Sequence, residues 1–166
     1  MSAAADVVLH VITLEEIAWG LALIVVTMLM HALAMPATIA VCNRIERRRS
    51  RLAGFLGAVR VLLVASLLIV LAHLLEVVVW AAFFWARGAL PTVSSAYYYA
   101  LLQYTTVGSE LSLNDRWHLL GGMIAIAGLL TFAWSTTVLL TLAQQFQDAL
   151  QPPPSTGGSS TGTPGV

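Results

Sequence analysis

The sequence predicts an all-α membrane protein with three transmembrane helices and one short re-entrant helix followed by a loop. Hydrophobic residues make up 58% of the 166 residues and charged residues only 10%, whereas about 25% charged residues is usual in soluble domains. Three long apolar stretches account for this composition. The segment between the last two is too apolar and aromatic for an ordinary water-exposed loop.

The three predicted spans cover residues 17–41, 52–85 and 117–146. Each exceeds the roughly 20 residues that a bilayer core of about 30 Å requires, and the last two are long enough to imply tilt or extension into water. The first span follows acidic rather than basic residues and is too long for the hydrophobic part of a signal peptide, so we interpret it as a true span. Tryptophans, the usual interface residues, mark the ends: Trp19, Trp80, Trp85 and Trp117.

Charged residues predict the orientation of these spans in the inner (plasma) membrane. Residues 42–51 (CNRIERRRSR) form a short, strongly basic loop, which should remain in the cytoplasm. The segment 1–16 would then lie outside the cell and the tail 147–166 in the cytoplasm. The tail is rich in Pro, Ser, Gly and Thr, a composition typical of disorder. The formal net charge of zero gives no reason to expect a nucleic-acid partner.

The segment between the second and third spans contains a short predicted helix at residues 94–104 (SSAYYYALLQY). Ser94 and Ser95 are good N-cap residues. The helix is too short to cross a bilayer and too aromatic to lie freely in water, which favours a helix that enters the membrane and leaves on the same side. Its C-terminus would point toward the membrane centre, where the negative end of its dipole favours a cation.

The loop after this helix reads Thr105-Thr106-Val107-Gly108-Ser109-Glu110. With the preceding Gln103-Tyr104, it resembles the selectivity-filter signature of the potassium-channel pore domain. The order of outer helix, aromatic-rich short helix, TTVG, acidic loop and inner helix is also that of this family. The resemblance covers about residues 67–143. It implies a pore domain at 52–146, with pore helix 94–104, filter 105–110 and inner helix 117–146, assembled as a homotetramer. The span at 17–41 lies outside the family's two-helix module.

By this resemblance, the filter carbonyls replace the hydration shell of a permeant ion. Thr106, Val107 and Gly108 would supply them, with Ser109 as a further member, and Thr105 would pack behind the filter. Glycine permits the unusual dihedrals that such a backbone needs. The expected ligands are permeant cations, K⁺ first, with Na⁺ or a divalent cation as alternatives. The expected partners are the bilayer and further copies of the chain, and no resident cofactor is expected.

The filter departs from the family at its outer end. The family signature continues as TVGYG, whereas Ser109 and Glu110 occupy the last two positions. A glutamate is strained where glycine would adopt a positive φ, so we expect a shorter, wider or rearranged upper filter. Four Glu110 side chains would form an acidic ring that attracts cations. The alternative is that Glu110 is a solvated loop acid paired with Arg116.

Two ionisable residues interrupt the second span. His73 and Glu76 are three residues apart and therefore share one helix face, and ionisable groups inside a membrane are candidates for function. His31 in the first span could meet them. One hypothesis is a buried metal or proton site made by His31, His73 and Glu76. The other is a polar clamp in which Glu76 bonds to Tyr, Ser or Thr hydroxyls at the back of the pore helix.

The third span carries a glycine and a polar stripe. Gly128, in the segment GLLTFAWS, occupies the position of the family's inner-helix hinge, so the resemblance implies a gating hinge. Close helix packing is the alternative. The stripe suits either a helix that lines a water-filled cavity or hydrogen bonds between helices; its residues are Thr131, Ser135, Thr136, Thr137 and Thr141.

Two functions remain open from the sequence. The first is a tetrameric cation channel that conducts K⁺ or mixed cations through Thr106, Val107 and Gly108. The second is a non-conducting protein of pore-like architecture with a buried metal- or proton-binding site at His73 and Glu76. An enzyme is not predicted, because no nucleophile, base and oxyanion-stabilising groups converge on one face.

Overall fold

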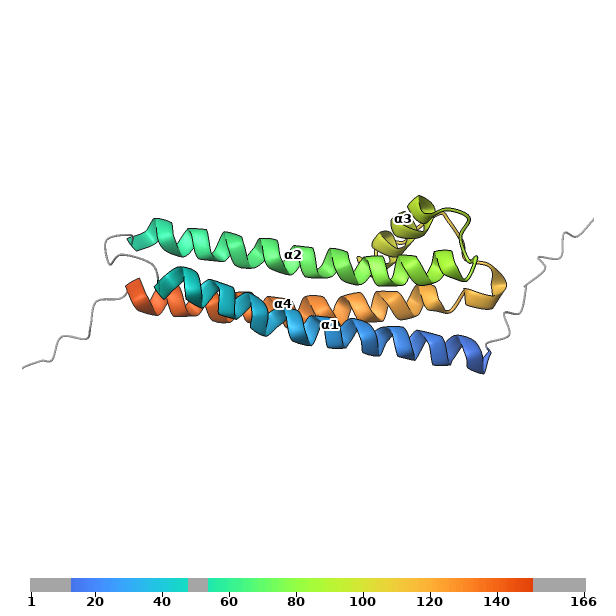
Figure 1. The fold of residues 1–166 in the computed structure, drawn as a ribbon, viewed down its shortest axis with the longest axis horizontal. Helices are drawn as coiled ribbons and strands as arrows, with labels where there is room; N and C mark the ends of the chain where they lie inside the picture. Colours follow the sequence, from blue (N-terminus) through green and yellow to red (C-terminus); the bar gives the residue numbers. More distant parts are fainter. Residues whose placement is uncertain (1–12, 48–53, 151–166) are drawn as a thin grey trace, which may run out of the picture.

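The computed structural model describes residues 13–47 and 54–150, and this part of the chain is helical with no strand (Figure 1). Three helices are long and apolar enough to cross a membrane, which confirms the prediction of an all-α membrane protein with three candidate spans. The elements in chain order are α1 (Leu14–Arg47), α2 (Gly54–Ala86), α3 (Val93–Tyr104), a 3₁₀ turn η1 (Asp115–Trp117) and α4 (Leu120–Leu150).

Helices α1 and α4 extend beyond the predicted boundaries. The first span was expected at 17–41, but α1 runs to Arg47 and so includes residues 42–47 of the predicted basic loop. Helix α4 continues to Leu150, into the predicted tail. Apolar runs end where the bilayer core ends, whereas backbone hydrogen bonds can continue into the interface. In α1, the basic residues Arg44 and Arg47 in the last turn also favour this continuation. The predictions for residues 1–12, 48–51 and 151–166 lie outside the described residues.

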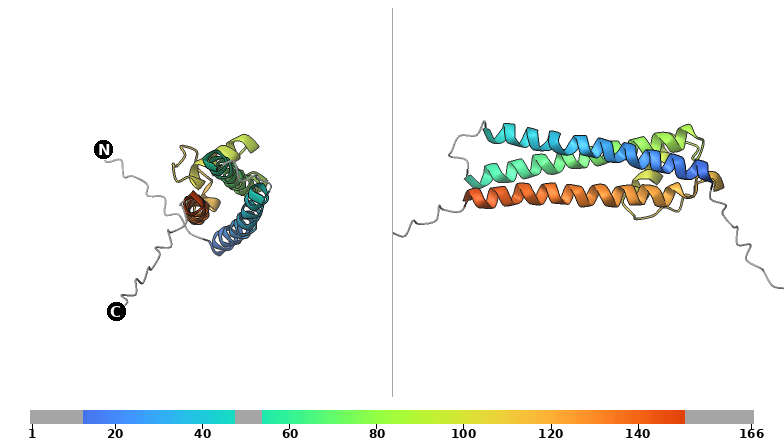
Figure 2. Two further views of the ribbon diagram at one scale, coloured as in Figure 1. Left: turned by 90° about the vertical axis from the view of Figure 1, so that its left-hand side faces the viewer. Right: turned by 90° about the horizontal axis from the view of Figure 1, so that it is seen from below.

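The three long helices lie side by side, and the short α3 leans against one end of the bundle (Figures 1 and 2). Two apolar clusters fill the bundle. The cluster at the α3 end includes Trp80, Phe84, Tyr99 and Ile124. The cluster toward the other end includes Met35, Val61 and Leu142. Buried polar residues of all four helices lie between them.

Helix α3 begins at Val93, and a capping box closes its first turn. The N-cap is Thr92, rather than the predicted Ser94 or Ser95. The Thr92 hydroxyl accepts from the Ser95 amide at 3.1 Å, and the Ser95 hydroxyl accepts from the Thr92 amide at 3.2 Å. This reciprocal pair satisfies two amides that a helix start leaves without partners.

The depth of α3 follows from its contacts with α2. The Arg87 guanidinium stacks over the Trp19 ring, 4.2 Å from the ring centroid, and such cation–aromatic groups mark the membrane interface. Glu76 lies eleven residues before Arg87, about 16 Å along the helix. The Tyr104 hydroxyl donates to the Glu76 carboxylate. The last residue of α3 therefore reaches the level of Glu76, about 16 Å along α2 from Arg87.

Two acidic residues at the start of α1 form polar contacts with residues at the start of α4. The Leu119 amide donates to the Glu16 carboxylate at 2.5 Å, which caps the N-terminus of α4. Arg116 bonds both carboxylate oxygens of Glu15, at 2.9 and 2.7 Å. Arg116 is thus paired with Glu15 and not, as the alternative for Glu110 supposed, with the filter loop.

Replacing Gly128 by Ala should lower stability, because its Cβ would collide with the backbone carbonyl of Tyr104. Overpacking costs about 1–3 kcal/mol, against a helix-propensity gain of at most about 1 kcal/mol. Gly122→Ala on the same helix is the control, since a Cβ there meets nothing within 4 Å. Thermal unfolding in detergent should show a lower Tm for Gly128→Ala alone. Equal shifts in the two variants would contradict the close contact.

Candidate functional site

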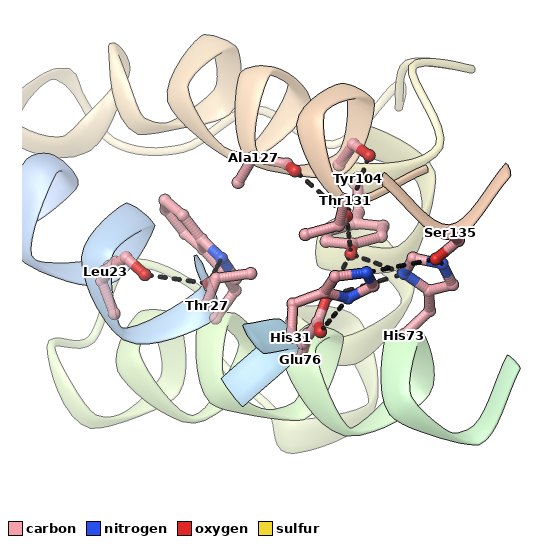
Figure 3. A network of polar contacts seen from close by, with 11 residues as sticks. Leu23, Thr27, His31, His73, Glu76, Tyr104, Ala127, Thr131 and Ser135 are labelled. Carbon is pink, nitrogen blue, oxygen red and sulfur yellow. Dashed lines mark hydrogen bonds and ion pairs between the residues drawn. The ribbon is translucent and has the colours of Figure 1, made fainter. Parts of the chain in front are cut away.

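A closed ring of hydrogen-bonded side chains lies in the middle of the bundle and joins all four helices (Figure 3). His31 comes from α1, His73 and Glu76 from α2, Tyr104 from α3 and Ser135 from α4. The structure therefore brings together the three residues that the sequence singled out. It adds two hydroxyls whose identity the sequence left open.

Each link of the ring is a direct contact. His31 Nδ1 lies 2.9 Å from Glu76 Oε1, and His31 Nε2 lies 3.2 Å from Ser135 Oγ. Ser135 Oγ also lies 3.1 Å from His73 Nε2. His73 Nδ1 is 2.9 Å from the Tyr104 hydroxyl, which donates to Glu76 Oε2 and closes the ring.

A sixth residue braces the ring from α4. Thr131 Oγ1 lies 2.5 Å from the Tyr104 hydroxyl and also contacts the carbonyls of Ala127 and Gly128, at 3.1 and 3.0 Å. Among the described residues, every buried side-chain nitrogen and oxygen has a hydrogen-bond partner. The polar clamp expected between Glu76 and hydroxyls of the short helix is thus present, through Tyr104 of α3, and it includes both histidines.

All five links of the ring can be hydrogen bonds at only one total number of bound protons. Its five links need five hydrogens. With Glu76 ionised and both imidazoles neutral, His31, His73, Ser135 and Tyr104 supply one hydrogen each, which leaves one link without a hydrogen. One additional proton completes the ring and makes its net charge zero. Neutrality also suits the site, because an uncompensated charge is costly to bury in a membrane.

The same residues have the donor set of a metal site. One ligand atom each from His31, His73 and Glu76 can be chosen so that all lie within 4.8 Å of one another, and all three residues are buried. Two imidazoles and a carboxylate are a common zinc donor set. A metal would have to replace hydrogen bonds that the ring already makes, so the arrangement favours a proton over a metal as its occupant.

The loop after α3 begins with a Schellman-type turn. The Thr106 amide donates to the Gln103 carbonyl and the Val107 amide to the Leu102 carbonyl, each at 3.0 Å, which is the bonding pattern of this C-cap. The left-handed residue of the motif is usually glycine, but here it is Thr106, with φ of 61°. A β-branched residue in this region is strained, and such strain is typical of functional sites.

Four consecutive amides of this loop point back toward α3. Those of Thr105, Thr106, Val107 and Gly108 all donate to carbonyls of residues 101–103. In a trans peptide unit the carbonyl points opposite to the amide N–H. The carbonyls of residues 104–107 therefore point away from the end of α3. Positive φ at Thr106 and Gly108, on either side of Val107, departs from an extended strand, in which successive carbonyls alternate.

The remaining predicted site residues lie nearby but outside the ring. Thr106, Val107, Gly108 and Glu110 are exposed, with Val107 73% exposed. Ser109 accepts the amide of Leu111 at 3.1 Å. Gly128 sits inside the continuous helix α4, against the Tyr104 carbonyl. This contact supports close packing at Gly128, while the hinge stays a prediction.

The predicted polar stripe of the third span divides into two faces. Thr131 and Ser135 are buried and serve the ring, whereas the three other threonines are exposed. Each exposed hydroxyl donates to the carbonyl four residues earlier: Thr136, Thr137 and Thr141. The signal that could have separated the faces is helical spacing: Ser135 is four residues from Thr131 and shares its face, whereas Thr136 and Thr137 are five and six residues away and do not.

Comparisons of the chain with protein-family models, with curated proteins and with solved structures found no match.

Replacing Tyr104 by Phe should open the ring and lower stability by about 1–3 kcal/mol, because a buried carboxylate oxygen and a ring nitrogen lose a partner. Tyr98→Phe is the matched control, since Tyr98 lies on the same helix with an exposed side chain. Unfolding of the two variants in detergent, followed by circular dichroism, would measure the difference. Equal stability of both variants would show that the ring does not hold the helices together.

Proposed function

We propose that four copies of this chain form a cation channel of the potassium-channel pore type. K⁺ or mixed cations would pass the carbonyls of Thr106, Val107 and Gly108, and four Glu110 side chains would form an acidic ring at the outer mouth. In this arrangement α3 is the re-entrant pore helix, α2 the outer helix and α4 the inner helix. The chain lies in the plasma membrane with its N-terminus outside and its C-terminus in the cytoplasm.

The observation that supports this proposal is exposed, non-helical backbone beside α2, one of the three candidate spans. The loop 105–108 follows directly on Tyr104, which contacts Glu76, ten residues before the end of α2. In the proposed orientation this level lies within the bilayer core. Irregular backbone at such a depth is tolerated only where other protein covers it or where it lines a water-filled cavity. On a single chain, residues 106–108 are exposed. A symmetric assembly around this loop provides both conditions, and the family resemblance sets its symmetry at four.

Three further features suit conduction. The carbonyls of Thr106 and Val107, two of the three proposed filter positions, point away from α3, as ion coordination by a carbonyl ring requires. The negative end of the α3 dipole adjoins them. The exposed threonines Thr136, Thr137 and Thr141 give α4 a polar face beyond the filter, which suits a helix that lines a wet cavity.

A second candidate function is a buried proton or metal site in a non-conducting protein. The closed ring of His31, His73, Glu76, Tyr104 and Ser135 favours it, because one proton completes the ring. Elemental analysis of the purified protein, with Glu76→Gln as the control, distinguishes a bound metal from a bound proton. Stoichiometric metal in the native protein alone would assign a metal.

Gly108→Ala should abolish K⁺ flux through the purified protein in liposomes. Gly108 has φ of 83°, and an alanine there is strained although its Cβ meets no atom within 4 Å. Gly88 is the matched control, because it has φ of 64°, equal free space and a place outside the filter. Gly88→Ala should therefore lose similar stability and keep its flux. Equal flux in both variants, or no flux in the native tetramer, would contradict the channel.

Glu110→Gln should reduce cation flux several-fold at low ionic strength and less at high salt, because the charge of an exposed acidic ring is screened by salt. Asp115→Asn removes another exposed acid close in the sequence and serves as the control. Flux of K⁺, Na⁺ and Ca²⁺ should be measured at two salt concentrations. An electrostatic effect of Glu110 lowers the flux of all three cations, whereas an effect on selectivity changes the ratios between them. If both variants behave alike, Glu110 has no special role at the mouth.

A further inference from the structure

An apolar groove lies between α1 and α2, in the half of the bundle away from α3. It encloses about 280 Å³ and is lined mainly by small and branched apolar side chains, with Glu76 at one end. Its lining includes Ala34, Ala37 and Val41 from α1 and Leu68, Leu71 and Leu75 from α2. If each methylene group takes about the 30 Å³ of one water molecule, the groove holds on the order of ten methylene groups.

Two arginines stand at the other end of this groove. Ala37, Val41 and Arg44 are spaced i, i+4 and i+7 on α1, so Arg44 continues the groove-lining face. On α2, Arg60 precedes Leu71 by eleven residues, close to three full turns, and therefore shares its face. Both arginines are exposed.

The two arginines also lie at the same level of the bundle. The Cys42 thiol lies 4.0 Å from the carbonyl of Val61. Arg44 is two residues beyond Cys42 on α1, and Arg60 is one residue before Val61 on the antiparallel α2. Their guanidinium groups are thus both available where an acyl chain leaving the groove would carry its headgroup.

The length of the groove matches one leaflet. Its lining on α1 runs from Met30 to Val41, eleven residues or about 16 Å along the helix, and one leaflet contributes about half of a bilayer core of about 30 Å. Arginine is well suited to phosphate, because its planar fork can make two parallel hydrogen bonds. The charge at the Arg44 end and the apolar groove above it are complementary to a phospholipid with net negative charge.

We propose that this groove binds one anionic phospholipid from the leaflet at the Arg44 end, with its phosphate on Arg44 and Arg60 and an acyl chain between α1 and α2. The lipid would fill space that the small side chains of Ala34 and Ala37 leave open. It would also cover the edge of the bundle next to Glu76. This site belongs to the helix pair that includes α1, and it does not depend on whether the loop after α3 conducts ions.

Native mass spectrometry of the full-length protein, titrated with phosphatidylglycerol and with phosphatidylcholine of the same acyl chains, tests the proposal. Phosphatidylglycerol should bind at least tenfold more tightly. Arg44→Gln and Arg60→Gln should each weaken phosphatidylglycerol about fivefold, and the double variant about 25-fold, while phosphatidylcholine changes little. Arg47→Gln, at the end of the same helix, should have a smaller effect. Equal affinity for both lipids, or an equal effect of Arg47→Gln, would overturn the proposal.

The groove itself is tested by filling it. Ala37→Phe should weaken both lipids at least fivefold, whereas Ala40→Phe, an exposed position of α1 outside the groove lining, should leave them unchanged. Circular dichroism and the native oligomeric mass establish that each variant is folded. If Ala37→Phe does not fold, the arginine variants decide alone, because both lie at exposed positions. Competition by glycerol phosphate as strong as by the lipid would overturn the role of the groove.

Discussion

The carboxylate of Glu76 is the interaction on which the arrangement of this bundle depends. Between apolar helices in lipid, hydrophobic burial gives little preference for one packing over another, so small residues and interhelical hydrogen bonds specify it. Glu76 uses one oxygen toward His31 of α1 and the other toward Tyr104 of α3. The two histidines then meet at Ser135 of α4. A single buried acid thus fixes the relative register of four helices.

The loop after α3 is held by this ring through Tyr104. The hydroxyl of Tyr104 belongs to the ring, and its carbonyl packs on Gly128, where no side chain would fit. The next residues begin the Schellman-type turn that places Thr106 in a left-handed conformation. Strain of this kind costs on the order of 1–3 kcal/mol and persists only where the surroundings determine the backbone. The ring on one side and α4 on the other provide that determination.

The sequence predicted what depends on composition and local pattern. Span number and the short helix followed from apolar length and from its flanking residues, and the pairing of His73 with Glu76 followed from spacing on one helix. Three contacts could not be predicted, because they depend on how distant helices are placed: His31 with Glu76, Ser135 between the histidines, and Glu16 at the start of α4. Helix ends were missed because apolar length measures the bilayer and not the hydrogen-bonded helix.

Helix α1 is therefore an integral part of the bundle, although the module that the sequence resembles has only two spans. Without α1, Glu76 and Ser135 would each lose His31 as a hydrogen-bonding partner. A buried carboxylate that lacks a partner is costly. The amide of Leu119 would also lose the carboxylate of Glu16. The ring thus couples α1 to Tyr104, the residue that precedes the loop 105–108.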